Sequence, residues 1–272
     1  LGQTNFWTRC AINAGRLFCG STDYSMQNGT LSDWRMVACE GNGDRCAAIR
    51  DDGTMYWGVP ASGPLPQYGS ASDWVSVNMG GASGMQDPFY CAFKTDGTLW
   101  CTHFGNGLSK ANGSWKDVCL ASYSTSCGIA LDGSLHCGTG MAWGSGPDPQ
   151  VGSDTDWVKL TCGDGYRQFN DISAHFCGLK ADGRLFCWGA NTYGQLGIGS
   201  FSRTDVPTEV VGGGKWSVIG AGSANSCGVK TASGSPPPVV SSLVATYLTD
   251  KSPAFTFTGK VRNVCQTSAK NR

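Results

Sequence analysis

A short motif built around two cysteines and a glycine turn repeats along this chain of 272 residues. In its full form, two cysteines ten residues apart flank an Asp-Gly pair, as at Cys91–Cys101, Cys127–Cys137 and Cys177–Cys187. A looser copy runs from Cys10 to Cys19, and two further copies, which begin at Cys46 and Cys227, lack the second cysteine. Because the copies recur about every forty residues, we expect a series of similar structural units.

Each copy predicts a β-hairpin, since Asp-Gly between β-prone apolar runs is the strongest short-range hairpin signal. A three-residue loop at 95–97 would pair Lys94 with Thr98 and set Cys91 directly opposite Cys101. The same register places the two cysteines directly opposite each other in the other two full copies. Directly opposed Cβ atoms lie about 4.5–5.5 Å apart, and the closer, non-hydrogen-bonded type of pair suits a disulfide. We therefore expect cross-strand disulfides in the hairpins, the looser copy included.

Six further cysteines have no partner within such a hairpin. In the second copy, Gly58 takes the place of the missing cysteine. Six cysteines allow fifteen pairings, so any assignment of them is one among several. The assignment that we favour is Cys39–Cys46 within one unit, Cys119–Cys162 between neighbouring units, and Cys227–Cys265 between the last hairpin and the tail.

The composition bears on where the protein works. An even count of 14 cysteines at recurring spacings indicates an oxidising compartment. Asn28 and Asn112 each open an acceptor sequon for N-linked glycans, which favours a secreted or cell-surface glycoprotein. The formal net charge is zero and no basic run occurs, which argues against binding to nucleic acids or to membrane surfaces. No apolar run predicts a membrane-spanning helix.

A tryptophan opens five of the units, and an apolar residue follows it at the third position. A ring of tryptophans can be a stacking surface for sugars or bases, or it can supply one core anchor to each unit. Because every unit has its tryptophan at the same position, we interpret these residues as core anchors. They are Trp34, Trp74, Trp115, Trp157 and Trp216, at steps of 40, 41, 42 and 59 residues.

The fifth unit carries a more specific pattern. It contains Trp188-Gly189, Asn191 and the run Gly194-Gln195-Leu196-Gly197, followed by 203–207. In these residues it resembles a repeat of the family named for regulator of chromosome condensation 1. The resemblance is strong over about 157–234 and weaker over 10–156, where the units keep the hairpin but lose the Gly-Gln-Leu-Gly loop.

The resemblance implies an all-β fold, a β-propeller of four-stranded blades. Six hairpins predict six blades, while family members usually carry seven, so a degenerate seventh blade remains open. We assign residues 1–234 to the propeller and 235–272 to a Pro-rich arm and a tail. Ser235-Pro236-Pro237-Pro238 favours polyproline II. In the tail, 255–261 alternates like a strand and leads to Cys265, so the tail can complete the last blade.

No pattern of catalytic or metal-binding residues stands out. The three histidines lack zinc-ligand spacing, and neither a Gly-x-Ser-x-Gly elbow nor a calcium-loop pattern occurs. Glutamate occurs only at Glu40 and Glu209, which leaves few carboxylates for glycoside cleavage. We therefore predict a protein that is not an enzyme and that uses no metal or cofactor.

The leading hypothesis is an extracellular protein that binds other extracellular proteins or further copies of itself. It would be an interaction module or a structural subunit of a cell-surface, matrix or filament assembly. The rival hypothesis is a secreted lectin, in which Trp143, Tyr166 and Tyr193 stack on sugar rings. A third is a secreted enzyme inhibitor, by analogy within the resembling family.

Overall fold

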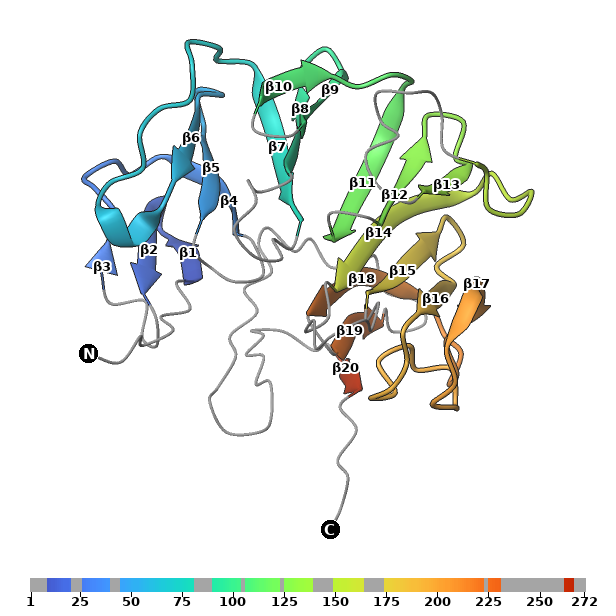
Figure 1. The fold of residues 1–272 in the computed structure, drawn as a ribbon. Helices are drawn as coiled ribbons and strands as arrows, with labels where there is room; N and C mark the ends of the chain where they lie inside the picture. The colour runs from blue at the N-terminus through green and yellow to red at the C-terminus, as the bar shows by residue number, and fades with distance from the viewer. Residues whose placement is uncertain are drawn as a thin grey trace, which may run out of the picture. The chain divides into compact units, whose positions relative to one another are not determined.

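The structure is a computed structural model. It describes residues 9–20, 26–39, 45–80, 90–103, 106–122, 125–138, 149–163, 174–222, 225–230 and 262–266. Almost all regular structure in these residues is β-strand, apart from one short 3-10 turn, η1 (Pro60–Ser62) (Figure 1). In the same residues, no helix has the length and apolar character needed to cross a membrane. The predicted all-β class is confirmed.

The chain divides into two compact units. Unit 1 comprises Leu1–Trp115, Ser122–Ser124 and Thr139–Pro147, and unit 2 comprises Lys116–Ala121, Thr125–Gly138 and Asp148–Arg272. Each contains antiparallel sheets whose strands follow one another along the chain, and we call these sheets blades 1 to 6.

Unit 1 contains blades 1, 2 and 3. Blade 1 consists of β1 (Arg9–Asn13), β2 (Arg16–Gly20) and β3 (Met26–Gln27). Blade 2 consists of β4 (Trp34–Cys39), β5 (Cys46–Arg50) and β6 (Met55–Gly58). Blade 3 has four strands: β7 (Trp74–Met79), β8 (Tyr90–Lys94), β9 (Leu99–His103) and β10 (Asn106–Lys110).

Unit 2 contains most of blade 4 and all of blades 5 and 6. Blade 4 consists of β11 (Trp115–Ser122), β12 (Thr125–Ala130) and β13 (Leu135–Gly138). Blade 5 has four strands: β14 (Trp157–Gly163), β15 (His175–Lys180), β16 (Leu185–Gly189) and β17 (Thr204–Glu209). Blade 6 consists of β18 (Trp216–Gly222), β19 (Asn225–Lys230) and β20 (Arg262–Gln266).

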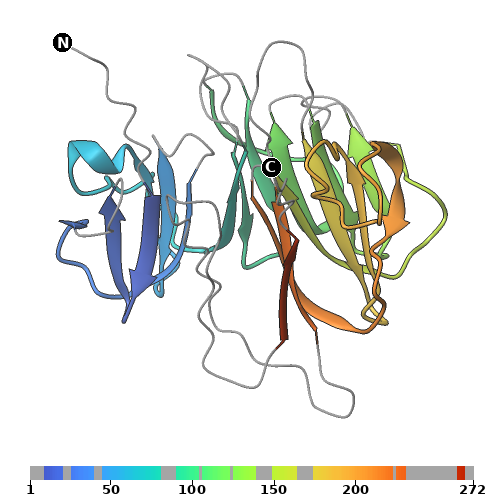
Figure 2. The same cartoon turned by 90° about the horizontal axis from the view of Figure 1, so that it is seen from below.

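The third strand of blade 6 comes from the tail of the chain. Strand β20 pairs with β19 in the register that sets Cys265 opposite Cys227. Figure 2 shows this late strand lying alongside β19. The tail segment expected to alternate as a strand, 255–261, lies outside the described residues, as does the Pro-rich run at 235–238.

The outermost strand is shortened in blades 2 and 4. In blade 2 it is reduced to a bridge between Tyr56 and Gln67, and in blade 4 to a bridge between His136 and Gln150. A proline precedes each bridging glutamine, Pro66 and Pro149, and proline cannot donate a ladder hydrogen bond. Blades 3 and 5 thus have the four strands expected of a propeller blade, and blades 2 and 4 keep the fourth strand as a single bridge beside the proline.

The hairpin turns have the predicted geometry. In blade 3, the Lys94 backbone N–H donates to the carbonyl of Thr98 at 3.0 Å, and the Gly97 N–H donates to the carbonyl of Lys94 at 3.0 Å. Gly97 has a φ of 79°, in the left-handed region that glycine adopts without strain. The register then sets Cys91 opposite Cys101, as the count along the sequence predicts.

The turn of one blade is hydrogen-bonded to the start of the next. The Trp74 N–H donates to the carbonyl of Gly53 at 3.0 Å, and the Trp216 N–H donates to the carbonyl of Gly183 at 2.8 Å. A Cβ added to Gly53 would collide with the Ser72 carbonyl oxygen. These contacts explain why the Asp-Gly turn and the tryptophan repeat together: Gly53 and Gly183 each position the tryptophan of the following blade.

The tryptophans that open the blades are core residues. Trp34, Trp74, Trp115, Trp157 and Trp216 are between 2% and 6% exposed. Each core cluster joins neighbouring blades; for example, Ile49 and Met55 of blade 2 cluster with Trp74 and Val77 of blade 3. Burying an aromatic side chain of this size is worth several kcal/mol, so these clusters are the main source of cohesion between adjacent blades.

A basic residue stands opposite the tryptophan in several blades, where it forms what we call the Trp–cation cluster. In blade 5, Lys180 Nζ lies 5.0 Å from the ring centre of Trp157 and contacts Asp154 at 2.7 Å and Asp156 at 2.9 Å. Burial by itself lowers the pKa of Lys180, but hydrogen bonds to the two carboxylates outweigh it and hold the pKa above its ordinary value. In blade 3, Lys94 and Asp73 repeat the arrangement over Trp74.

Candidate functional site

The hairpin cysteines form cross-strand disulfides in four blades. The bonds are Cys10–Cys19, Cys91–Cys101, Cys127–Cys137 and Cys177–Cys187. Their Cα–Cα distances are 4.1 to 4.2 Å, which suits the closely spaced, non-hydrogen-bonded type of strand pair. The predicted link within each hairpin is therefore present.

The remaining cysteines follow the favoured assignment. Cys39 is bonded to Cys46 within blade 2, and Cys119 is bonded to Cys162 between blades 4 and 5. Cys227 is disulfide-bonded and faces Cys265 in the strand register. In blade 2, Cys46 lies opposite Gly58, where a Cβ would meet Pro66 Cδ at 3.1 Å. Cys46 therefore forms its disulfide with Cys39 of β4, the strand on its other side.

The two sequon asparagines lie in different surroundings. Asn112 is exposed, whereas Asn28 is 7% exposed. The Asn28 amide donates to the carbonyl of Gly63 at 2.9 Å, and its oxygen accepts from the Leu65 N–H at 3.0 Å. The same nitrogen also donates to the carbonyl of Pro60 at 3.4 Å. A glycan on Asn28 would replace one of the two amide hydrogens, so one of these two bonds would be lost. Glycosylation in the folded chain therefore remains a prediction for Asn112 and conflicts with the contacts of Asn28.

Of the three residues proposed for sugar stacking, only Tyr193 is described. Trp143 and Tyr166 lie outside the described residues. Tyr193 is 57% exposed and belongs to the segment 190–203 between β16 and β17, which we call the blade-5 loop. This loop carries the Gly-Gln-Leu-Gly run that the sequence singles out.

Buried amides hold the blade-5 loop in shape. Asn191, 1% exposed, donates from its amide to the carbonyls of Ser200 at 2.8 Å and Ser202 at 3.0 Å. Its oxygen accepts from the Leu196 N–H at 3.0 Å. Asn28 makes the same kind of contacts to the segment after η1. The asparagine of the family pattern thus acts as an internal brace for an outer loop.

Gln195 and Leu196 complete the support of the loop. Gln195 is 2% exposed, and its side-chain oxygen accepts from the Tyr193 N–H at 2.9 Å. Leu196 is 1% exposed and packs in the cluster between blades 5 and 6. Gly194 has a φ of 75° and lies under the ring of Phe201, where a Cβ would come within 3.1 Å of that ring. The loop is therefore a fixed platform.

This platform and the residues that follow it expose apolar side chains. The described residues contain seven exposed large hydrophobics, and four of them lie within 193–211. We call these four the blade-5 patch: Tyr193 (57% exposed), Phe201 (66%), Val206 (64%) and Val211 (49%). Beside it, the Arg203 guanidinium pairs with Asp205 at 2.8 Å, so the charges at this edge are internally balanced.

Sequence reasoning singled out Tyr193 but missed the other three patch residues. Phe201 and Val211 are apolar residues in a segment without a clear period, which the sequence alone does not assign to core or surface. The exposure of Phe201 follows from the internal hydrogen bonds of the loop, because those bonds direct the amides inward and leave the apolar side chain outside. Val206 lies in β17 and Val211 lies just beyond that strand.

A buried histidine lies where blade 5 meets blade 6. His175 is fully buried, and its Nε2 lies 2.9 Å from Ser226 Oγ. Burial lowers the pKa of His175 from 6.5 to about 4, so the ring is neutral at physiological pH. The Ser226 hydroxyl also lies 3.5 Å from Cys177 Sγ. Nothing in this geometry activates a nucleophile for catalysis at an open site, and we interpret His175 as part of the interior.

Comparison with known proteins agrees with this architecture. The profile of the regulator of chromosome condensation (RCC1) repeat matches residues 182–229, the segment that contains the blade-5 loop. Human WBSCR16 is similar in structure, with a TM-score of 0.58 at 15% identity over 83% of this chain and 73% of the other.

Two further solved structures are similar. Prp20p from Saccharomyces cerevisiae gives a TM-score of 0.59 at 12% identity, over 84% of this chain and 68% of that one. The structure of BBS1N in complex with ARL6DN gives a TM-score of 0.55 at 5% identity, over 82% of this chain and 71% of that one. At such identities the likeness establishes the fold. The chain is a β-propeller with disulfide-linked hairpins, and its residues 182–229 are an RCC1 repeat.

Proposed function

We propose that this protein is a non-catalytic, extracellular protein-binding propeller, and that the blade-5 patch is its contact surface. The observation that carries the proposal is the concentration of four exposed apolar side chains within 193–211, two of which, Tyr193 and Phe201, lie on a loop held by buried hydrogen bonds. A rigid loop loses little conformational entropy on binding, so aromatic anchors on it contribute more of their burial to affinity.

The chemistry of the patch favours a protein partner over a sugar. Sugar sites combine an aromatic face with polar groups that bind hydroxyls. In the blade-5 loop, the amides of Asn191 and Gln195 are buried and hydrogen-bonded within the loop. The other exposed large side chains of 193–211, Phe201, Val206 and Val211, are aromatic or aliphatic, which suits the apolar centre of a protein interface.

Two further observations support the proposal. Six disulfides among the described residues suit an oxidising environment, as in secreted and cell-surface proteins. Propellers similar in fold have protein partners: one solved structure shows Kap60 bound to yeast RCC1 (Prp20), and another shows BBS1N with ARL6DN. We propose another extracellular protein, or a further copy of this chain, as the partner.

The test compares a patch variant with a matched surface variant. Tyr193→Ser/Phe201→Ser removes the two aromatic side chains of the patch. Leu131→Ser removes an exposed apolar side chain, 68% exposed, from the hairpin turn of blade 4. The oxidised full chain is first examined by size-exclusion light scattering for self-association. It is then immobilised and exposed to extracellular proteins of its source and, separately, to a glycan array.

We expect saturable binding of a defined protein, or self-association, that weakens at least about tenfold in the double variant, as for interface anchors. Leu131→Ser should bind like the unaltered chain. Equal binding by both variants would exclude the blade-5 patch. Saturable binding to one class of glycan, lost in the double variant, would instead establish the lectin hypothesis, and tight binding to a single enzyme with loss of its activity would establish the inhibitor.

A further inference from the structure

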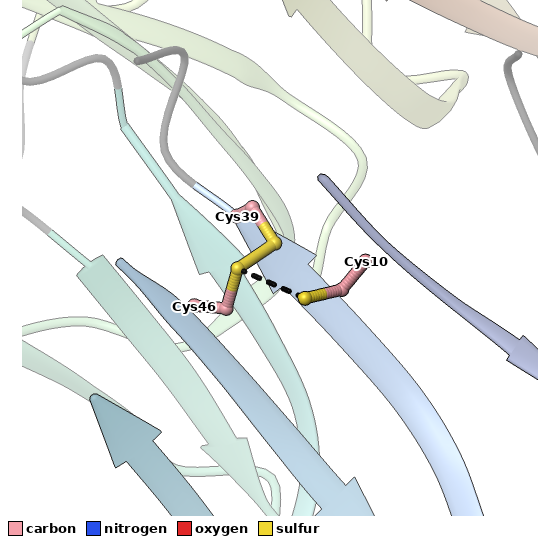
Figure 3. A group of neighbouring side chains, drawn as sticks. All are labelled: Cys10, Cys39 and Cys46. Carbon is pink, nitrogen blue, oxygen red and sulfur yellow. Dashed lines mark hydrogen bonds between the residues drawn. A yellow bond between two sulfur atoms is a disulfide. The ribbon is translucent and has the colours of Figure 1, made fainter. Parts of the chain in front are cut away.

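Two disulfides of unit 1 touch each other. Cys10 Sγ, which is bonded to Cys19, lies 3.5 Å from Cys46 Sγ, which is bonded to Cys39. Because both sulfurs are in disulfides, neither carries a hydrogen, and the approach is a van der Waals contact. The sulfurs of Cys10, Cys39 and Cys46 all lie within 4.8 Å of one another, and Figure 3 shows the Cys10 sulfur beside the Cys39–Cys46 disulfide.

The departure of blade 2 from the hairpin pattern creates this cluster. Cys10 in β1 and Cys46 in β5 are the first cysteines of consecutive hairpins, and other blades have a cysteine at the same place. In blade 2, Gly58 replaces the second hairpin cysteine, and Cys39 at the end of β4 takes over as the partner of Cys46. Cys39 brings the third sulfur to within 4.8 Å of the other two. The sulfur of Cys19 is bonded to that of Cys10 and lies outside this group of three, so Cys19 would have to turn towards it to supply a fourth ligand.

We propose that these four cysteines form a metal site when their two disulfides are reduced: a tetrathiolate site for Zn²⁺ or a similar soft divalent ion. Structural zinc is held by four ligands at tetrahedral corners, with Zn–S near 2.3 Å, which separates neighbouring sulfurs by about 3.8 Å. The contact of 3.5 Å between the sulfurs of Cys10 and Cys46 is close to this separation, and the sulfur of Cys39 lies within 4.8 Å of both.

Burial also suits a closed structural site. Cys46 is fully buried and Cys19 is 3% exposed, while Cys10 and Cys39 are half-buried. Four thiolates from two adjacent hairpins would complete the coordination and leave no open position for water. Among the described residues, the sulfurs of Cys10, Cys39 and Cys46 are the one group of three or more such ligand atoms close enough to hold an ion.

The chemistry balances with an external reductant. Two molecules of a dithiol reduce the two disulfides to four thiols and are themselves oxidised to two cyclic disulfides. Binding of Zn²⁺ by four thiolates then releases up to four protons, so affinity should rise with pH. The same four residues would thus be covalently cross-linked under oxidising conditions and metal-linked under reducing ones. This site is independent of protein binding by the blade-5 patch.

Cobalt titration of the reduced full chain tests the site, because Co²⁺ bound by four thiolates absorbs strongly in the visible. We expect saturation at one Co²⁺ per chain and loss of the absorption when Zn²⁺ is added. The variant Cys10→Ser/Cys39→Ser should lose the signal. The matched control Cys91→Ser/Cys101→Ser removes one hairpin pair of blade 3 that is not in the cluster, and it should keep the signal.

Thiol labelling distinguishes a specific site from metal binding by an unfolded chain. The reduced chain is alkylated with and without Zn²⁺, and the labelled peptides are mapped by mass spectrometry. Zn²⁺ should slow alkylation of Cys10, Cys19, Cys39 and Cys46 at least about tenfold relative to Cys91 and Cys101. Uniform protection of all cysteines, protection of none, or an equal loss of the Co²⁺ signal in both variants would overturn the proposal.

Discussion

Blades 4 and 5 bury a tryptophan at the same position but support it differently. In blade 5, Lys180 lies over the ring of Trp157 and contacts two aspartates, while Nε1 of that tryptophan has no hydrogen-bond partner among the residues that the structure describes. In blade 4, Trp115 is preceded by Ser114, and Ala130 stands where blade 5 has the lysine. There, Trp115 Nε1 donates to the carbonyl of Asn112 at 2.8 Å.

This difference shows that apolar burial holds the tryptophan in place and that the polar groups around it are secondary. Trp157 is 2% exposed and Trp115 is 5% exposed, so burial is the same with either kind of polar support. Apolar burial is non-directional and contributes several kcal/mol for a side chain of this size. Polar groups around it can therefore vary between blades, provided that buried charges keep their partners.

The largest effect should come from the disulfide that joins these two blades. Cys119–Cys162 closes 43 residues and Cys177–Cys187, within blade 5, closes 10. The loop-entropy relation gives about 4 kcal/mol for the first and about 3 kcal/mol for the second. Cys119→Ser/Cys162→Ser should therefore lower the free energy of unfolding more than Cys177→Ser/Cys187→Ser, as measured by urea denaturation. A larger loss from the hairpin pair would contradict this order.

The contrast between these two disulfides also shows what the sequence predicts well. Hairpin pairs follow from counting across an Asp-Gly turn, because register is local, and Cys91–Cys101 could be placed in this way. The pairing Cys119–Cys162 depends on how two blades lie against each other, so spacing left it as one choice of several. The shortened outer strands of blades 2 and 4 likewise depend on where Pro66 and Pro149 fall in a sheet.

The candidate site was harder to predict for a related reason. Asn28 has the sequence pattern of a glycan acceptor, but in the fold it braces a loop more than thirty residues away, as its bond to Gly63 shows. Asn191 belongs to a family pattern and does the same for the blade-5 loop. Local sequence does not distinguish an exposed amide from one whose partners are distant carbonyls. For the same reason, the exposure of Phe201 could not be inferred.

The next effect is a pH-dependent loss of stability, which we expect from a histidine of blade 5 and not from one of blade 4. His175 has a pKa of about 4 in the folded protein because it is buried, against 6.5 when exposed. Below pH 6.5 this histidine is therefore protonated in the unfolded chain, whereas in the folded chain it stays neutral until the pH approaches 4. Stability should be level above that pH and fall by about 3 kcal/mol as the pH drops towards 4, at about 1.4 kcal/mol per pKa unit.

Urea denaturation between pH 4 and 7.5 measures this dependence. His175→Gln should flatten the fall, because the variant cannot take up the proton in either state. The control is His136→Gln in blade 4, which removes a half-buried histidine hydrogen-bonded to Ser134 and should leave the fall in place. If the fall persists unchanged in His175→Gln, another group causes it.

A smaller effect is expected from the carboxylates of the Trp–cation cluster. Asp154→Asn/Asp156→Asn leaves the Lys180 ammonium, whose side chain is 5% exposed, with neutral partners that still accept hydrogen bonds. We expect a loss of about 2 kcal/mol. Lys180→Met removes the buried charge itself and leaves the two aspartates, which are 42% and 57% exposed, without their cationic partner. It should therefore lower the free energy of unfolding by about 1 kcal/mol. Equal losses would mean that burial of the ammonium is unimportant.

The smallest effect tests whether the cluster can be transferred to blade 4. Ser114→Asp/Ala130→Lys gives that blade the lysine and, of the two aspartates that accompany Trp157 in blade 5, the one next to it in the sequence. Because Trp115 already has a carbonyl partner and is already buried, the new ion pair should add at most about 1 kcal/mol to the free energy of unfolding. Each single substitution should leave the free energy of unfolding unchanged or lower it slightly. The change in the double variant should be more favourable than the sum of the two single changes. A double variant less stable than either single would show that the lysine cannot reach the ring, so that the two kinds of support are not interchangeable.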